Sequence, residues 1–228
     1  MRFARHEQKY LISFSDYKFL SHALGQVLAR DSHANADGGY VVRSIYFDTL
    51  GHRAFYEKLD GVPLRKKIRL RTYSVHDRTV KLEIKHKATD RVFKESTSIS
   101  PEDAAALIEG RRECLLKYDD PVSGRVYAEF STEHYRPVVM MDYWREAFTY
   151  GVNGVRITFD RFLSKHSGRF DIFSTRARKS RIQDGRTVIM EVKYDRCLPE
   201  WIKTIVQNTG HNRMAISKFC MGRIGEPQ

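Results

Sequence analysis

The sequence predicts an α+β fold that is dominated by antiparallel β-strands, with a few helices flanking the sheet. About eight segments alternate apolar and charged side chains, which is the pattern of strands with two unlike faces. Short turns join most of these segments, and helical periodicity is confined to a few places. Together these observations favour an antiparallel sheet or barrel.

The strands are predicted from their β-branched and aromatic content combined with this alternation. The segment YVVRSIYFDT at 40–49 is typical, and a turn around His76 and Asp77 joins two later strands into a meander. The expected strands are residues 5–13, 40–49, 63–74, 79–88, 91–99, 137–150, 155–163 and 187–195.

Three helices are predicted from capping signals and from apolar residues at helical spacing. One begins with Ser100 as its N-cap and Pro101 at its first position, and it ends near Gly110. The other two begin near Ser15 and Pro199. Their apolar faces are expected to be Leu20, Leu24, Val27 and Leu28 in the first, and Trp201, Ile202, Ile205 and Val206 in the second. Further helical turns are expected within 111–135 and between Met214 and Met221, and an exposed basic excursion at 165–181.

The length of 228 residues suits one large domain, and no repeat or low-complexity segment marks a boundary. We therefore expect a single domain over residues 1–228. A hydrophobic content of 41% with 12% aromatic residues excludes a disordered chain.

The cysteines and the N-terminal residues predict the cellular compartment of the protein. Cys114, Cys197 and Cys220 are odd in number and lack CxxC spacing, which argues against a disulfide framework or a zinc site. The start, MRFARHEQKY, lacks the apolar region of a signal peptide, and no segment approaches the roughly 20 apolar residues of a membrane span. We expect a cytoplasmic protein with reduced thiols and no membrane partner.

The charge balance points to an acidic partner. Lys and Arg number 40 against 28 Asp and Glu, which gives a formal charge of +12. Nucleic acid, an anionic membrane, a nucleotide or a phosphate polymer would all suit this excess. Solubility alone is the remaining explanation, and net charge does not distinguish among these.

The position of the charges within the strands is more informative than their number. Lys67, Arg69 and Arg71 share one face of a strand, while Ile68 and Leu70 share the other. The same pattern recurs at Lys81, Glu83, Lys85 and Lys87, at Glu7 and Lys9, at Tyr143 and Arg145, at Arg156, Thr158 and Asp160, and at Glu191 and Lys193.

Two interpretations of these charged faces are open. A half-buried sheet normally turns its polar face to water. A solvated face, however, usually mixes both charge signs with Ser, Thr and Gln, whereas Lys and Arg dominate here. If the sheet closes into a barrel, the cations would line its lumen and repel one another unless a polyanion were bound. The few glutamates among them would then suit a hard divalent ion.

Several segments, taken in order, resemble the vacuolar transporter chaperone (VTC) domain. They are HEQKY at 6–10, RKKIRLRTY at 65–73, KLEIKHK at 81–87, YWREAF at 143–148, VRITFDR at 155–161, MEVKYD at 190–195 and SKF at 217–219. That domain belongs to the triphosphate tunnel metalloenzymes, which are related to the CYTH proteins. The resemblance implies an eight-stranded antiparallel β-barrel tunnel. It also implies a polyphosphate polymerase that uses a nucleoside triphosphate such as ATP with Mn²⁺ or Mg²⁺, and that binds polyphosphate or pyrophosphate.

The resemblance also implies particular site residues. The positions that match the family's phosphate-binding cations are Lys9, Arg69, Arg71, Lys85, Arg145, Arg156 and Lys218, and the position that matches its metal-binding glutamate is Glu191. Strand parity adds Lys81, Lys87 and Lys193 as substrate-binding candidates, and Glu7 and Glu83 as further metal ligands. Arg69, Arg71, Arg145 and Arg156 are the candidates for clamping the reacting phosphate oxygens. The run Arg176, Arg178, Lys179 and Arg181 is expected in an exposed loop outside the site.

Other functions remain open from the sequence. A triphosphatase in the same tunnel would use water as acceptor, and a plugged tunnel end would favour it. A non-catalytic polyphosphate-binding module is a second alternative. An RNA-binding module is disfavoured because Tyr46, Phe47 and Phe159 are expected in the core rather than exposed for base stacking. The oligomeric state is not predicted.

Overall fold

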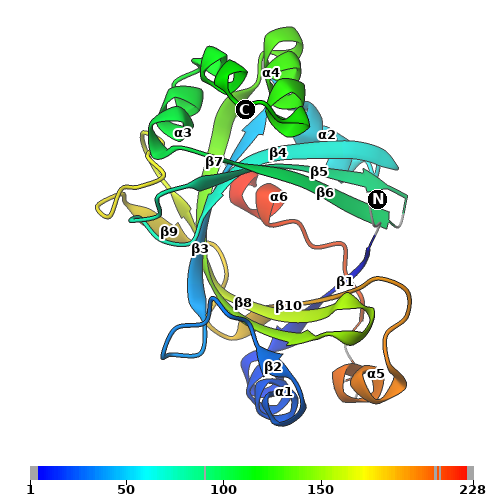
Figure 1. The fold of residues 1–228 in the computed structure, drawn as a ribbon. Coiled ribbons are helices and arrows are strands. Elements are labelled where there is room, and N and C mark those ends of the chain that lie inside the picture. The colour runs from blue at the N-terminus through cyan, green and yellow to red at the C-terminus, as the bar shows by residue number, and fades with distance from the viewer. Residues whose placement is uncertain (1–4, 90, 208–209, 211, 225–228) are drawn as a thin grey trace.

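The computed structural model describes residues 5–89, 91–207, 210 and 212–224. Figure 1 shows a strongly curved sheet that wraps around an interior, with helices on its outer side. The strands are β1 (His6–Ser13), β2 (Ala29–Arg30), β3 (Tyr40–Asp48), β4 (Leu64–Thr72), β5 (Val80–Ala88), β6 (Arg91–Ile99), β7 (Arg136–Tyr150), β8 (Val155–His166), β9 (Lys179–Arg181) and β10 (Thr187–Tyr194). The helices are α1 (Phe14–Val27), α2 (Arg53–Leu59), α3 (Pro101–Ile108), η1 (Arg112–Lys117), α4 (Pro121–Glu133), η2 (Val152–Gly154), α5 (Glu200–Gln207) and α6 (Lys218–Arg223).

The main path of the sheet has the predicted eight strands in the order β1-β10-β8-β7-β3-β4-β5-β6. All of its pairings are antiparallel, which confirms the predicted fold class. The short strands β2 and β9 pair with β7 and β8 outside this path. Among the described residues, the two edges of the sheet meet at a single isolated bridge, between Arg5, which precedes β1, and Val92 of β6. The expectation of a closed barrel is therefore corrected to a curled sheet whose edges touch at one point.

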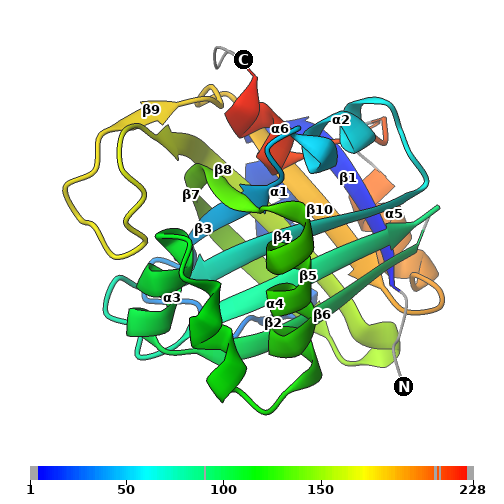
Figure 2. The ribbon, with the colours of Figure 1, turned by 90° about the horizontal axis from the view of Figure 1, so that it is seen from above.

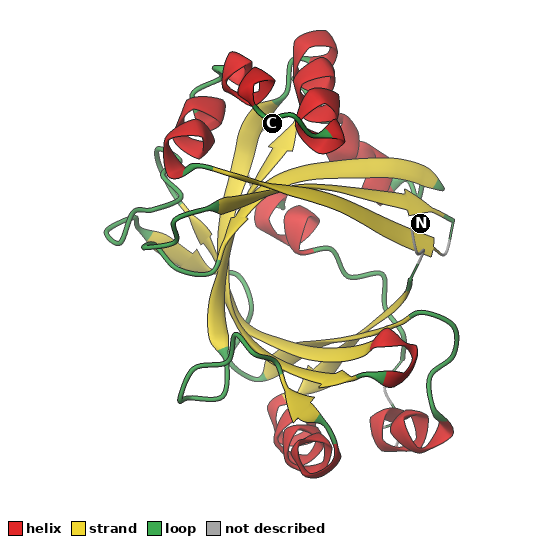
Figure 3. Ribbon diagram, in the orientation of Figure 1, coloured by secondary structure: helices red, strands yellow, loops and turns green. Residues whose placement is uncertain are grey.

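Helices cover the apolar outer face of the sheet at two places. Tyr17, Leu20 and Leu24 of α1 pack with α5 against the outer side of β8 and β10. On the other side, α3 and α4 cover the apolar residues of β4 and β5. Figure 3 shows this arrangement, with helices above and below the strands. Because the apolar faces are covered from outside, the charged faces of the same strands point inward.

One helix lies against the inner face instead. Phe219 and Cys220 of α6 are buried with Val139 and Met141 of β7. Contact is close, since a Cβ added at Gly222 would lie 2.7 Å from the Met141 sulfur. Seen from above in Figure 2, α6 lies beside α2 at one end of the interior. That end is thus filled by apolar packing.

Helix α2 was not predicted, and its start explains why. His52 at its N-terminus has φ 55° and makes no capping hydrogen bond with its side chain. Instead the buried Asp48 carboxylate accepts hydrogen bonds from the backbone N–H groups of Thr49, Ala54 and Phe55. A cap supplied from the preceding strand leaves no local signature in the sequence.

Two smaller expectations also need correction. Trp201 was expected in the core, but it is 40% exposed. Its ring contacts the ring of Tyr150 edge-on. The excursion 165–181 is not all loop, since Lys179 and Arg181 lie in β9, which pairs with β8. None of the described helices is long and apolar enough to cross a lipid bilayer.

Candidate functional site

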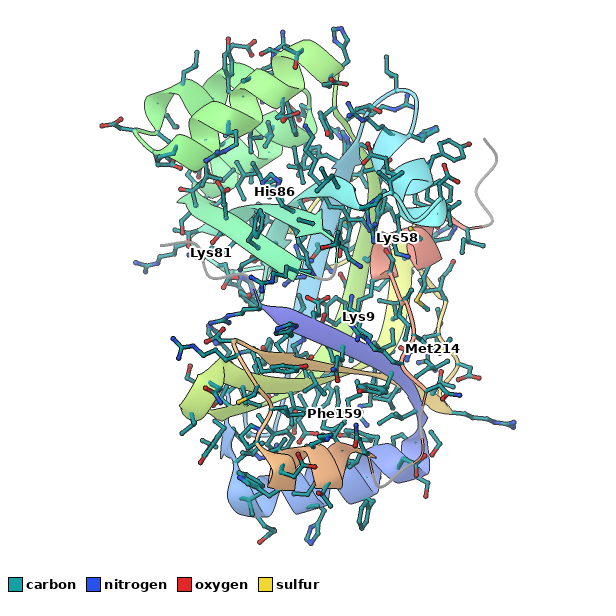
Figure 4. All side chains as sticks on the ribbon, turned by 90° about the vertical axis from the view of Figure 1, so that its right-hand side faces the viewer. Lys9, Lys58, Lys81, His86, Phe159 and Met214 are labelled. Carbon is teal, nitrogen blue, oxygen red and sulfur yellow. The ribbon has the colours of Figure 1, made fainter. Side chains whose placement is uncertain are left out.

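The inward-facing charges surround a cavity of about 400 Å³ inside the curled sheet. Its walls come from β1, β3, β4, β5, β6, β7 and β10, from α2, and from the segment 213–219 that precedes and enters α6. Met214 donates its backbone N–H to the carbonyl of Lys9, which ties this segment to β1. Figure 4 shows Lys9 on β1 with Met214 beside it.

Two carboxylates and three lysines form the centre of the cavity wall. Cross-strand register places Lys9 opposite Glu191 and Glu7 opposite Lys193. Lys9 Nζ lies 3.0 Å from Glu7 Oε1 and 3.5 Å from Glu191 Oε1. Lys85 Nζ lies 2.7 Å from Glu7 Oε2, and Lys193 Nζ lies 3.1 Å from Glu191 Oε2. Opposite charges therefore alternate around this group.

The protonation of the two carboxylates follows from these neighbours. Burial and the second carboxylate act to raise the pKa of Glu7, but the surrounding lysines outweigh them and lower it. Burial also acts to raise the pKa of Glu191, and Lys193 and Lys9 hold it well below its ordinary value. Both side chains are consequently anionic at neutral pH, and both keep the charge that a metal ligand needs.

A second buried group is centred on Asp160. Arg145 donates two hydrogen bonds to its carboxylate, with Nε–Oδ1 and Nη2–Oδ2 distances of 2.6 and 2.8 Å. Lys218 Nζ lies 2.6 Å from Asp160 Oδ2. Burial opposes ionisation, but the two cations lower the pKa of Asp160 to about 2. The bidentate pair fixes the orientation of Arg145 toward the cavity.

The two arginines of β4 are held by different partners. Arg69 Nε lies 2.6 Å from Glu83 Oε2, whose other oxygen meets Lys94 at 2.7 Å. Arg71 donates instead to the hydroxyl groups of Ser44 and Tyr143, at 3.1 and 3.0 Å. Among described residues no carboxylate lies within ion-pair distance of Arg71, so its charge is available to an anion.

The structure brings most of the predicted site residues to the cavity wall, and three of them lie outside it. Those that line the cavity are Glu7, Lys9, Arg69, Arg71, Lys85, Lys87, Arg145, Glu191, Lys193 and Lys218. Lys81 is exposed and donates to Ser98. Arg156 pairs with Asp31 and donates to the hydroxyl of Tyr40 at 2.9 Å.

Glu83, predicted as a possible metal ligand, is also outside the cavity lining. It is only 1% exposed, and its two oxygens are taken by Arg69 and Lys94. These cations lower its pKa far below the ordinary value despite burial, which acts in the opposite direction. Its position suits holding Arg69 in place better than it suits binding a metal ion.

Several residues at the cavity were not assigned to the site from the sequence. Arg65 and Lys67 share the inward parity of β4, and Asp160, which holds Arg145 from outside the lining, has the inward parity of β8. The alternation therefore contained their signal. Lys58 lies on α2, a helix that was not predicted. Lys179 was expected in an exposed loop. Its amine instead contacts the buried carboxylate of Asp142.

Glu7 and Glu191 are the carboxylates that fit a divalent ion. Among the described residues, no group of three or more His, Cys, Asp or Glu side chains is placed to hold a metal on its own. Mg²⁺ and similar hard ions, however, commonly take one or two carboxylates and complete their shell with water and substrate phosphates. Two adjacent anionic carboxylates on a phosphate-sized basic cavity match that donor set.

Comparisons with known proteins agree with this arrangement. The family model of the VTC domain matches residues 4–224. An adenylyl cyclase candidate from Hippeastrum, reported with a dominant triphosphatase activity, superposes with a TM-score of 0.58 at 16% identity, over 100% of this chain and 98% of that one. An adenylate cyclase candidate from Bacillus halodurans gives 0.55 at 12% identity, over 91% of this chain and 88% of that one.

A third solved structure, an adenylate cyclase candidate from Vibrio parahaemolyticus, gives a TM-score of 0.54 at 13% identity, over 97% of this chain and 98% of that one. At this level of identity the likeness shows that the chain shares the fold of these neighbours. No curated protein sequence matches significantly.

Proposed function

The chain belongs to the VTC domain family, and on this premise we propose that it is a metal-dependent polyphosphate polymerase. It would transfer the terminal phosphoryl group of a nucleoside triphosphate, with ATP as the expected donor, to inorganic polyphosphate. The observation that carries this proposal is the convergence of cations from five strands, α2 and α6 on one cavity that also holds two anionic glutamates.

The roles of the arginines follow from the chemistry of phosphoryl transfer. The reaction needs positioning and charge stabilisation rather than covalent help from the protein. Arg69, Arg71 and Arg145 present guanidinium groups that can each grip two phosphate oxygens. Glu83 and Asp160 hold two of these arginines in place through the ion pairs described above. The clamp is therefore organised before substrate arrives, which is what lowers the barrier.

The lysines provide charge without fixed geometry. Lys9 and Lys85 pair with the carboxylates in the ligand-free protein, and each can turn toward a phosphate oxygen. Lys218 supports Asp160 and lines the same wall. A Mn²⁺ or Mg²⁺ ion held by Glu191 and Glu7 would offset charge on the phosphate oxygens. Lys81 and Arg156 lie outside the cavity lining, so we give them no part in the transfer step.

A triphosphatase is the second candidate, because α6 fills one end of the interior. An interior that is closed at one end leaves less room for a long polyphosphate product. Water is a small acceptor and would still fit. The activity reported for the Hippeastrum protein is of this class, although it is stated only for that protein. The same arginines and glutamates would serve both reactions, so the acceptor alone separates them.

The two reactions can be separated by their products. The purified protein is incubated with ATP and Mn²⁺, and the products are run on a gel stained for polyphosphate. Polymer is the result expected from the proposed function. Free phosphate without polymer would instead indicate a triphosphatase. If neither product forms and the protein still binds polyphosphate, it is a binding module.

A further inference from the structure

Four neighbouring cations in one part of the cavity wall have no carboxylate partner among the described residues. They are Lys58 of α2, Arg65 and Lys67 of β4, and Lys87 of β5, and we call them the carboxylate-free branch. Within the described part of the chain, no Asp or Glu oxygen lies within 4.0 Å of their charged nitrogens. Lys67 Nζ instead contacts the hydroxyl of Ser217 at 2.9 Å, and Arg65 donates to the backbone carbonyl of Val62.

Strand register places these cations where they repel one another. Arg65 lies directly opposite Lys87, and Lys67 directly opposite Lys85. Like charges at opposed positions of an antiparallel pair are destabilising. Burial and then the nearby Arg65 and Lys58 lower the pKa of Lys87. The unliganded branch therefore carries an electrostatic cost that a bound anion would relieve.

The branch lies beside α6, at the end of the interior that α6 fills. Phe219 of α6 packs there with Tyr46 and with Val139. Lys67 lies beside this packing, with its amine 4.8 Å from the centre of the Phe219 ring. Figure 4 shows Lys58 on the same side of the molecule as Met214, which also lines the cavity. The cations thus line the part of the cavity wall that lies next to α6.

We propose that the carboxylate-free branch is a second anion subsite, which holds the phosphate units of a polyphosphate chain that extends beyond the triphosphate. This inference rests on the proposed function, because it assumes that a triphosphate occupies the part of the cavity that contains Glu7 and Glu191. The absence of carboxylates distinguishes the branch chemically: it can hold phosphate without a metal ion, through lysine and arginine alone. A triphosphatase would have no use for such a subsite.

The test compares two ligands in the absence of ATP. Calorimetric titrations with tripolyphosphate and with a much longer polyphosphate are made on the wild type and on Lys67→Gln and Lys87→Gln. Lys66→Gln is the matched control, because Lys66 neighbours Lys67 on β4 but faces outward and pairs with Glu129. Inorganic phosphate serves as a third ligand, to detect binding of a single phosphate group at the branch.

We expect each branch variant to raise the Kd for long polyphosphate about tenfold, since a charge-assisted contact is lost, and to leave the Kd for tripolyphosphate unchanged. The control should change neither. Equal weakening of both ligands, or no weakening of either, would overturn the second subsite. Inorganic phosphate that binds the branch as tightly as long polyphosphate would also overturn it. If the wild type binds no tripolyphosphate, the proposed function itself fails, which is a separate outcome.

Discussion

The part of the cavity that contains Glu7 and Glu191 and the carboxylate-free branch share strands β4 and β5. They differ in whether their cations pair with carboxylates. On β4, Arg69 is paired with Glu83 while Lys67 has only a hydroxyl and a ring beside it. On β5, Lys85 reaches Glu7, and Lys87 two residues further on has no such partner. The register places Glu83 opposite Arg69 and Lys85 opposite Lys67, and β1 brings Glu7 to Lys85, so the difference comes from which residue the sheet places beside each cation.

This difference separates two tasks. The carboxylate-bearing part is organised without ligand, because its ion pairs fix the side chains at defined positions. Such preorganisation suits the reacting phosphates. The carboxylate-free branch is unfavourable until an anion binds, which suits a loosely held chain that must move after each addition. The predictions below change one part at a time, in order of decreasing expected effect.

Glu191→Gln should abolish metal-dependent turnover, because it removes an anionic oxygen ligand while keeping size and polarity. Binding of tripolyphosphate without metal should be retained, since a negative charge is lost from a basic site. Turnover with Mn²⁺ and binding by calorimetry are the two measurements, with folding checked by circular dichroism. Near-normal turnover would show that Glu7 or another carboxylate suffices for the metal.

Arg145→Ala should reduce turnover by roughly 10²-fold or more, the usual cost of removing a preorganised charge donor. The matched control is Arg178→Ala, an exposed arginine of the excursion 165–181 whose loss should change only the salt dependence of association. Lys179 would be a poor control because it contacts the buried Asp142. A larger effect at Arg178 than at Arg145, measured as kcat/KM at two salt concentrations, would place the site outside the cavity.

A smaller effect is expected in the pH dependence of stability, and it belongs to the carboxylate-free branch. Burial, with neighbouring lysines, lowers the pKa of Lys67 from 10.5 to about 7. Between these values the unfolded chain binds more protons than the folded one, so this residue's contribution to stability rises with pH. The ligand-free wild type should gain more in Tm than Lys67→Gln between neutral and alkaline pH. The difference should be about 2–4 °C, the shift that about 1 kcal/mol causes in a chain of this size.

Long polyphosphate should suppress this difference, because a bound anion favours the charged lysine. The measurement is a thermal melt at several pH values with and without the ligand. An identical pH profile for wild type and variant would mean that Lys67 is already charged in the ligand-free protein, and would remove one reason for treating the branch as unbalanced.

The sequence predicted which side chains of each strand point inward. It did not predict which of these inward side chains reach the cavity. Alternation of period two placed Lys9, Glu191 and Arg69 on the inner face, because it depends only on neighbours in the chain. Arg156 and Lys81 have the same inward parity and still lie outside the cavity lining. Their distance from its centre depends on strand tilt and register, which the pattern of a single strand does not contain.

Contacts between side chains on different elements were equally hidden. The sequence suggested Glu83 as a metal ligand, and only the pairing of β5 with its neighbours reveals that Arg69 and Lys94 occupy it. Lys58 reaches the cavity from α2, whose start depends on hydrogen bonds to the Asp48 carboxylate. These contacts join residues through the fold, so local propensity gives no sign of them.

Following a labelled phosphoryl group tests the proposed polymerase reaction most directly. ATP carrying label in its terminal phosphate is incubated with the protein, Mn²⁺ and an unlabelled polyphosphate primer, and the products are separated by size. We predict label in chains longer than the primer, and none in such chains when Glu191→Gln replaces the wild type. Label found only in free phosphate, under conditions where calorimetry shows the primer to be bound, would contradict the polymerase and leave a triphosphatase in its place.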